Sequence, residues 1–288
     1  MIDTHVHVYS DDVATYPNLQ PEELREQMAE VPSTADGVLG LMEGAGVRGA
    51  CAVQALAKYG DDNSYVVDTA NAHPERFVSV VYVSPQDPDP VGRLDTWIAQ
   101  GAVGIRLSAS GGLLQAENLA QSGVRALVTG ATERRTGVIF HLHFDEVPQL
   151  RALLEDVPDL RLALDHCAGL DAAALRGGPP YRHAAELVEL AAYPGVHLKV
   201  TSMAFDEALD AGVDPRALVA FLAETFGVER LMWGSDWSHT RDRPYEALAD
   251  LARHACSELS TAEQDLILDA NAVRFWPGLA SLAAATPR

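Results

Sequence analysis

The amino-acid sequence predicts a single-domain parallel (β/α)8 barrel, and three observations lead to this fold class. Apolar segments of strand length alternate eight times with segments of helical character. No glycine-rich phosphate turn follows the first strand, where the competing doubly wound open sheet would normally carry one. No low-complexity linker divides the 288 residues, so one domain over residues 1–288 is expected.

The eight predicted strands are recognised by their apolar patterning. In the first, residues 1–8, apolar and polar side chains alternate with the two-residue period of a β-strand. The second, residues 48–54, is mostly small and apolar, as a strand buried on both faces should be. The other six are expected at residues 77–83, 102–107, 137–144, 160–165, 196–200 and 230–234.

Helices are expected between these strands. Ser33 or Thr34 is the expected cap of the first helix, residues 34–46, which ends at two glycines. The other helices are expected at about residues 63–72, 91–100, 119–134, 147–155, 183–192, after Pro215 and at about 245–256, with a closing helix at about 261–275. The polar segment 9–33 is too long for a simple turn and is expected to form a lid or a wall.

Composition limits the possible partners. An apolar fraction of 48% is enough to form a sizeable core. The sequence contains no run of about 18 apolar residues, so no membrane span is predicted. The balance of 21 basic against 41 acidic residues argues against nucleic acid or an anionic membrane as a partner. Three distant cysteines predict neither a disulfide framework nor a zinc knuckle, which fits a reducing cytoplasm.

Ionisable residues collect where the predicted strands end. A parallel barrel places its active site at the carboxyl ends of its strands, and six of the eight strands deliver such groups there. These groups are His5 and His7, Arg106, His141 and His143, Asp165 and His166, Lys199, and Asp236. This convergence is the main indication of a catalytic site.

His5 and His7 are two residues apart on a strand, so their side chains are expected on the same side. Two such imidazoles can converge on a metal ion or on a polarised carbonyl oxygen. The alternative is a pair of structural histidines bound to the backbone, which is disfavoured because burying two imidazoles is costly. Asp236 is the best single candidate, since a carboxylate among histidines can bind metal, hold water or accept a proton.

For the remaining candidate residues the sequence predicts a single role in most cases and leaves two roles possible in one. His143 is expected nearer the barrel mouth than His141, which would support the site from deeper in the barrel. His166 is expected in the site rather than as a capping residue. Arg106 has the shape to bind a carboxylate through two nitrogens. Lys199 leaves two possibilities open, a site residue or a core lysine paired with a carboxylate.

With these residues in place, the chain resembles the amidohydrolase superfamily, in particular its amidohydrolase-2 branch. The matching segments are Asp3-Thr4-His5-Val6-His7, Leu164-Asp165-His166, Leu198-Lys199-Val200, Leu231 through Gly234-Ser235-Asp236-Trp237, and Asn271 through Phe275. Within the branch, similarity to lactone hydrolases, including the 2-pyrone-4,6-dicarboxylate, sugar-acid and muconolactone lactonases, is carried by Val53-Gln54, by Tyr59 through Asn63, and by Gly104-Ile105-Arg106.

This resemblance implies a (β/α)8 barrel in which Asp236 is the base on water, with His5, His7 and His166 near the electrophilic carbonyl. Relatives in the branch use one divalent ion or none. A two-metal site is not expected, because Arg106 stands where two-metal members carry a bridging lysine or glutamate, and a guanidinium cannot bridge metals. The expected ligands of a single ion, Zn²⁺, are His5, His7, His143 and Asp236.

The function expected from these residues is hydrolysis of a lactone that carries a carboxylate. Asp236 would deprotonate water, and the histidines or a bound Zn²⁺ would stabilise the oxyanion. The expected substrate-binding residues are Arg106, Lys199, Tyr59, Gln54 and Arg241, with Arg243 as a further candidate. Two alternatives stay open: a metal-dependent decarboxylase of an aromatic or unsaturated acid, and an inactive barrel that only binds ligands. The oligomeric state also stays open.

Overall fold

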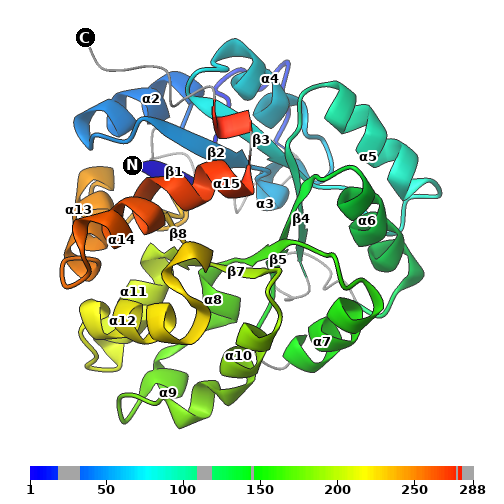
Figure 1. Cartoon of the computed structure of the whole chain (residues 1–288). Helices are drawn as coiled ribbons and strands as arrows, with labels where there is room; N and C mark the ends of the chain where they lie inside the picture. The colour runs from blue at the N-terminus through cyan, green and yellow to red at the C-terminus, as the bar shows by residue number, and fades with distance from the viewer. Residues whose placement is uncertain (19–32, 109–118, 144–145, 277, 281–288) are drawn as a thin grey trace.

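The computed structural model describes residues 1–18, 33–108, 119–143, 146–276 and 278–280. Eight parallel strands follow one another around a single sheet in sequence order (Figure 1). They are β1 (Ile2–Val6), β2 (Gly49–Val53), β3 (Phe77–Val81), β4 (Gly104–Ser108), β5 (Gly137–His141), β6 (Leu162–Leu164), β7 (Val196–Thr201) and β8 (Leu231–Gly234). Val6 bridges Trp237 in parallel just beyond β8, so the first and last strands meet. The predicted single-domain (β/α)8 barrel is confirmed.

Helices surround the strands (Figure 1). They are α2 (Ala35–Gly44), α3 (Leu56–Tyr59), α4 (Ser64–Ala72), α5 (Pro90–Ala99), α6 (Ser122–Glu133), α7 (Val147–Asp156), α8 (His166–Gly169), α9 (Ala172–Leu175), α10 (Ala185–Glu189), α11 (Ser202–Asp210), α12 (Pro215–Phe226), α13 (Tyr245–Ala255), α14 (Thr261–Asp265) and α15 (Asn271–Phe275). Thr34 caps α2 by accepting a hydrogen bond from the Gly37 amide, as predicted.

The predicted strand segments all contain strands, but two boundaries matter for the site. β1 ends at Val6, two residues before the predicted end. β5 ends at His141, so His143 lies beyond the strand. The predicted helix at 183–192 is broken into α10 with a 3₁₀ turn on each side. Most of the predicted lid at 9–33, residues 19–32, lies outside the described residues.

The amino end of the barrel is closed by packing. Apolar side chains from the strands form a buried cluster with Phe275 and Trp276, at the end of α15. The Asn271 amide donates to the carbonyls of Val228 and Leu231, at 2.8 Å each, and so fixes α15 beside β8. The predicted closing segment at about 261–275 is present as α14, a π-helical turn and α15. This packing leaves the carboxyl end of the barrel for chemistry.

Among the described residues, no helix has the length and the apolar character needed to cross a membrane. The three cysteines are free and buried. Burial raises the pKa of the Cys167 thiol, as in a cysteine that packs in the core and is not a nucleophile.

Candidate active site

β1 and the turn after β8 are held together by one buried carboxylate. Asp3 Oδ1 accepts hydrogen bonds from the backbone amides of His5 and Ser235, each at 2.9 Å. The Tyr245 hydroxyl donates to Asp3 Oδ2 at 2.9 Å. The Asp236 amide in turn donates to the His5 carbonyl at 2.9 Å. These contacts bring the first and the eighth strands together at the point where each contributes a candidate catalytic residue.

His5, His7 and Asp236 form a compact trio of buried side chains. The Nε2 atoms of His5 and His7 lie 3.2 Å apart. They lie 3.6 Å and 3.8 Å from Asp236 Oδ1, respectively. Tetrahedral Zn²⁺ with nitrogen ligands at ~2.0–2.1 Å would space its ligand atoms about 3.3 Å apart. Asp236 Oδ1 is buried and has no hydrogen-bond partner among the described residues. The trio therefore has the size and the donor chemistry to hold one divalent cation.

Both histidines are neutral, and the partner of His7 fixes its proton. His7 Nδ1 lies 2.9 Å from the Val53 carbonyl, which can only accept, so this nitrogen carries the hydrogen. Nε2 of His7 then presents a lone pair to the trio. Burial lowers the pKa of His7 well below its usual value and lowers the pKa of His5 to about 3.

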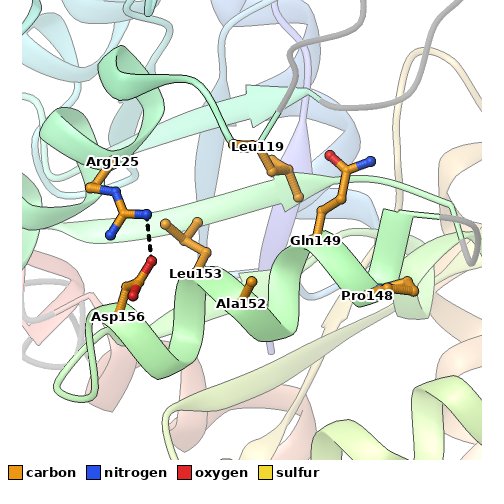
Figure 2. A pocket seen from close by; sticks show the side chains of 8 residues that line it. Leu119, Arg125, Pro148, Gln149, Ala152, Leu153 and Asp156 are labelled. Carbon is orange, nitrogen blue, oxygen red and sulfur yellow. Dashed lines mark ion pairs between the residues drawn. The ribbon is translucent and has the colours of Figure 1, made fainter.

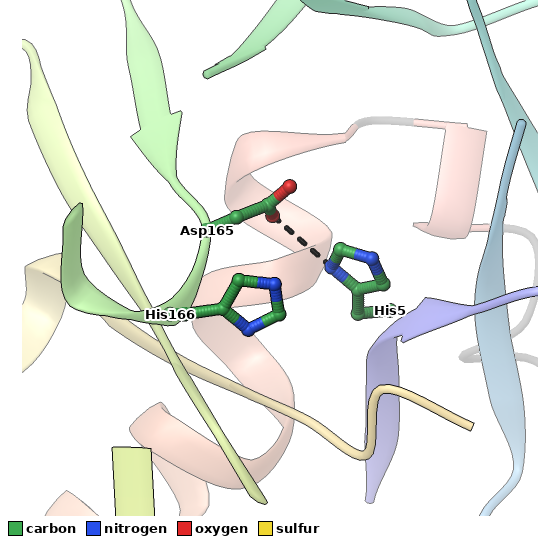
Figure 3. Close-up of side chains that lie close together, drawn as sticks. All are labelled: His5, Asp165 and His166. Carbon is green, nitrogen blue, oxygen red and sulfur yellow. Dashed lines mark hydrogen bonds and ion pairs between the residues drawn. The ribbon is translucent and has the colours of Figure 1, made fainter. Parts of the chain in front are cut away.

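A second buried carboxylate, Asp165, orients His5 from behind (Figure 3). Asp165 Oδ1 lies 3.0 Å from His5 Nδ1 and 2.8 Å from Lys199 Nζ. Arg106 Nε donates to Asp165 Oδ2 at 2.8 Å. Burial by itself would raise the pKa of Asp165, but His5, Lys199 and Arg106 outweigh burial and hold this pKa well below its usual value. Asp165 is therefore ionised.

Arg106 and Lys199, both predicted to bind substrate, are thus engaged by Asp165. Lys199 is fully buried, as expected from its alternative reading as a lysine paired with a carboxylate. Its Nζ also lies 2.7 Å from His5 Nδ1. In neutral His5 the hydrogen is on one ring nitrogen. If Nδ1 lacks it, Nδ1 can accept a hydrogen bond from Lys199; if Nδ1 carries it, Nδ1 can donate to Asp165. In the second case Nε2 of His5 is left as a ligand for a cation.

His166 stands at the start of an unusual turn after β6. His166, Cys167, Ala168 and Gly169 have φ angles of 52°, 53°, 62° and 67°, a run of left-handed residues. Such a conformation costs about 1–2 kcal/mol for each residue other than glycine. The His166 Nδ1 lies 2.7 Å from the Thr201 hydroxyl, and its ring centroid lies 5.4 Å from that of His5. The turn brings His166 into the predicted cluster.

His5, Asp165 and His166 form a second group that can hold a metal ion (Figure 3). In this group Asp165 is already neutralised by two buried cations. A divalent ion placed beside those cations would be repelled by them, whereas Asp236 Oδ1 is not in contact with either. The trio of His5, His7 and Asp236 is therefore the better metal site.

The structure does not bring His143 to this trio. His143 is exposed, and it belongs to neither of the metal-binding groups found among the described residues. His141 is closer to the cluster, with its ring centroid 5.4 Å from that of His166. Burial lowers the pKa of His141 to about 4. Because β5 ends at His141, the pleat no longer sets the direction of the His143 side chain.

Two predicted pocket residues shape the neighbouring loops. Gln54 Nε2 donates to the carbonyls of Gly60 and Asp62, at 2.9 Å and 2.8 Å. The Tyr59 hydroxyl accepts from the Ser10 amide at 2.8 Å. Gln54 and Tyr59 thereby hold the loops that follow β1 and β2, and substrate contact by either residue stays a prediction.

The loop after β8 carries a residue that sequence reasoning missed. The His239 ring centroid lies 4.2 Å from that of His7, and His239 Nδ1 lies 3.9 Å from Asp236 Oδ1. Its position three residues after Asp236 was the available signal.

In the same loop Arg241 is exposed and has no carboxylate partner among the described residues. Arg243 is paired with Asp206 and Asp242.

A separate pocket of about 320 Å³ lies on the outside of the barrel between α6 and α7 (Figure 2). Leu119, Ala152 and Leu153 give it a mostly apolar wall, and the ion pair of Arg125 with Asp156 lies at one side. None of the predicted site residues lines this pocket. The histidine cluster, not this pocket, is the candidate active site.

Together the fold and the site define a class: (β/α)8 barrels with a His-x-His pair at the end of the first strand and an aspartate just after the eighth. A family model described as Amidohydrolase matches residues 2–278, so the chain belongs to the amidohydrolase family. The resemblance found in the sequence is confirmed. The chain is accordingly a hydrolase-type enzyme of this family.

Two characterised relatives share sequence with the chain. The 4-sulfomuconolactone hydrolase of Rhizobium radiobacter is 26% identical over 250 residues, which cover 83% of this chain and 75% of that protein. The L-fucono-1,5-lactonase of Burkholderia ambifaria is 36% identical over 100 residues, which cover 33% of this chain. The second alignment spans only 32% of that lactonase.

Solved structures share the fold over nearly the whole chain. A putative 2-pyrone-4,6-dicarboxylic acid hydrolase from Pseudomonas putida has a TM-score of 0.77, with 24% identity and coverage of 96% and 97% of the two chains. A zinc-bound amidohydrolase from Burkholderia multivorans has a TM-score of 0.71, with 23% identity and coverage of 96% and 98%. The 2,6-dihydroxybenzoate decarboxylase from Rhizobium has a TM-score of 0.67, with 14% identity and coverage of 96% and 97%.

Proposed function

We propose that this chain hydrolyses the ring ester of a small lactone. The observation that carries the proposal is the buried trio of His5, His7 and Asp236 at the carboxyl end of the barrel. Membership of the amidohydrolase family and sequence similarity to two lactone hydrolases support the same reaction class.

Asp236 is the base in this proposal. Burial raises the pKa of Asp236 to about 7, although the positive charge of Arg106 acts in the opposite direction. A base with a pKa near the working pH is suited to proton transfer. Asp236 accepts a proton from water while the water oxygen bonds to the ester carbonyl carbon. When the ring C–O bond breaks, the proton passes to the departing ring oxygen, and an open-chain hydroxy acid is formed.

The carbonyl oxygen needs a positive partner, because the neutral His7 presents a lone pair and not a hydrogen. We propose that His5, His7 and Asp236 hold one Zn²⁺, which when bound would polarise the ester carbonyl. With the hydrogen on Nδ1 donated to Asp165, Nε2 of His5 would be free to bind the ion. His166, close to His5 and bonded to Thr201, is proposed to donate a hydrogen bond to the same oxygen.

Non-oxidative decarboxylation is the second candidate. Its support is the shared fold with a dihydroxybenzoate decarboxylase and the presence of a possible single-metal site. Lactone hydrolysis is preferred because the decarboxylase likeness, at 14% identity, concerns the fold alone, whereas the lactone hydrolases match in sequence. Release of CO₂ from aromatic or unsaturated acids would favour the second candidate.

The test combines metal analysis of the purified protein with a lactone panel followed by proton release. We expect stoichiometric zinc and turnover of at least one lactone. Asp236→Asn should lower kcat by about two orders of magnitude or more with unchanged circular dichroism. Asp206→Asn, in an ion pair with Arg243, is the matched control and should retain activity. Near-normal turnover in Asp236→Asn would remove this residue from the role of base.

A further inference from the structure

The chain contains only two lysines, one on a strand of the barrel and one in the short helix that follows another strand. Lys199, on β7, is fully buried and paired with Asp165. Lys58 lies in α3, the short helix that begins three residues after β2. The two ammonium groups therefore share one end of the barrel but differ in whether a carboxylate neutralises them.

Lys58 is held by aromatic rings instead of by an acid. Its Nζ lies 4.6 Å from the centroid of the Tyr9 ring and 5.5 Å from that of Tyr59. Among the described residues no carboxylate forms an ion pair with Lys58, although the chain has 41 acidic residues. The side chain is half-buried, and this burial lowers the pKa of its ammonium group. Partial burial of an unpaired charge is costly, so Lys58 would be stabilised by an anionic partner that is not part of the described chain.

Tyr9 links Lys58 to the catalytic trio. It stands two residues after His7, its side chain is buried, and its ring centroid lies 4.6 Å from Lys58 Nζ. Burial is the main cause that raises the pKa of Tyr9; the Asp236 charge raises it further, and the Arg241 charge lowers it. Lys58 lies over this ring, and Arg241, in the loop after β8, is a second cation without an acidic partner in the described part of the chain.

The loop that carries Lys58 is fixed in place. The Gln54 side chain holds the carbonyls of Gly60 and Asp62, and the Tyr59 hydroxyl binds the Ser10 amide. A charged group on a fixed loop loses less conformational entropy on binding than one on a free loop. The same loop contacts therefore prepare Lys58 for a ligand at the mouth.

We infer that Lys58 binds a carboxylate carried by the substrate, with Arg241 as the second cation, and thereby selects lactones that carry an anionic substituent beside the ring ester. This inference rests on the proposed lactone hydrolysis. Arg106 and Lys199, which the sequence suggested for this task, are occupied by Asp165. Lys58 is then the specificity-determining cation contributed by the loop after β2.

Binding can be tested without catalysis, with citrate as the anionic probe and trimethyl citrate as its uncharged counterpart. Calorimetry should give a citrate Kd about tenfold weaker for Lys58→Gln than for the wild type, the loss expected for one charged contact. Lys58→Arg should keep most of the affinity. Arg216→Gln, at a surface cation paired with Asp214 and Glu258, should keep all of it. Equal citrate affinity in wild type and Lys58→Gln, or no citrate binding by the wild type, overturns the inference.

Chemical labelling gives a second readout. Because Lys199 is fully buried, an amine-acylating reagent should modify Lys58 and leave Lys199 unmodified, as read by peptide mass spectrometry. Citrate should slow the modification of Lys58, and trimethyl citrate should not. Acylation of Lys58 at the same rate in both solutions contradicts a carboxylate bound at its ammonium group.

Kinetics separates this inference from the proposed function. With a carboxylated lactone, Lys58→Gln should raise KM about tenfold at nearly unchanged kcat. The methyl ester of the same lactone should be hydrolysed equally by both proteins. A similar loss for both substrates would mean that Lys58 only supports the loop, which overturns the inference. If the wild type cleaves no lactone while Lys58 still governs citrate binding, the proposed function fails and the carboxylate site stands.

Discussion

At the residue scale, the charged side chains of the site form two groups, one around Asp165 and one around Asp236. Asp165 neutralises Lys199 and Arg106 on one side of His5, while Asp236 and His7 lie on the other side. His5 separates the two carboxylates and is itself neutral, since burial lowers its pKa to about 3. This division keeps Asp165 ionised as a structural anion and allows Asp236 to exchange protons near neutral pH.

The pH dependence of kcat/KM follows from Asp236. Its pKa is raised to about 7, so below this pH the protonated carboxyl, which cannot act as a base, predominates. We expect kcat/KM to rise with pH through about 7 in the absence of added metal. Added Zn²⁺ should move the rise to lower pH, because a bound cation favours the carboxylate. Profiles recorded at limiting and at saturating zinc check this, and identical flat profiles would contradict it.

Asp165→Asn should be strongly destabilising. The substitution leaves the buried Lys199 and the nearly buried Arg106 without their anion, which costs about 3–5 kcal/mol in urea unfolding. The pKa of Asp165 is depressed in the folded state, so its contribution is present above the unfolded pKa and is lost as pH falls through the folded pKa. The difference between wild type and variant should therefore shrink in acid.

The matched control for Asp165 is Asp95→Asn, which breaks an exposed ion pair with Arg134. Exposed pairs contribute little, so this variant should unfold close to the wild type. Equal stability losses for the two variants would show that the buried charge cluster does not stabilise the fold.

At the element scale, the turn after β6 is strained where it delivers His166. Four successive residues adopt left-handed angles, and only the last is a glycine. Gly169 has no alternative, since a Cβ there would meet His143 Nδ1 at 2.5 Å and the Leu142 carbonyl at 3.0 Å. Strain of this kind persists where the surrounding structure fixes it, and it gathers at functional sites.

Ala168→Gly tests this strain against Ala174→Gly, a buried alanine in the right-handed helix α9. Both changes remove one buried methyl group. Glycine relieves the left-handed strain only at position 168, so Ala168→Gly should be about 1–2 kcal/mol less destabilising than its control. Urea unfolding measures both. The same cost at the two positions would mean that the turn is not strained.

At the scale of the whole molecule, the first strand is fixed at both of its ends. Asp3 joins it to the turn after β8 through the His5 and Ser235 amides, and Met1 pairs with Asp269 in the π-helical turn before α15. The trio of His5, His7 and Asp236 lies where the ends of β1 and β8 meet. A cation bound there would therefore link the first strand to the turn after the eighth and stabilise the closed barrel.

Zinc at a hundredfold excess over its Kd should stabilise the fold by about 2.7 kcal/mol, and a chelator should reverse the effect. His7→Ala and Asp236→Asn should abolish the shift in Tm. His143→Ala should retain it, because that side chain is exposed and outside the trio. Loss of the shift in His143→Ala would instead support the four-ligand set suggested by the sequence.

Much of the barrel could be predicted from the sequence, because the cause of each strand is local. The apolar runs of β2 to β8 and the turns between them are properties of neighbouring residues, so the strand segments were found, with errors at their ends. The same local logic located His5, His7 and Asp236 at strand ends, where a parallel barrel gathers its chemistry.

The partners of these residues were decided only by the tertiary structure. The sequence by itself determined that a cationic residue stands at positions 58, 106 and 199. It did not determine that Asp165 engages Arg106 and Lys199 while tyrosine rings hold Lys58. Ion pairing and pKa depend on burial and on distances of a few ångströms between residues that lie on different strands and loops, tens of positions apart in the sequence, and only the closed barrel sets those distances.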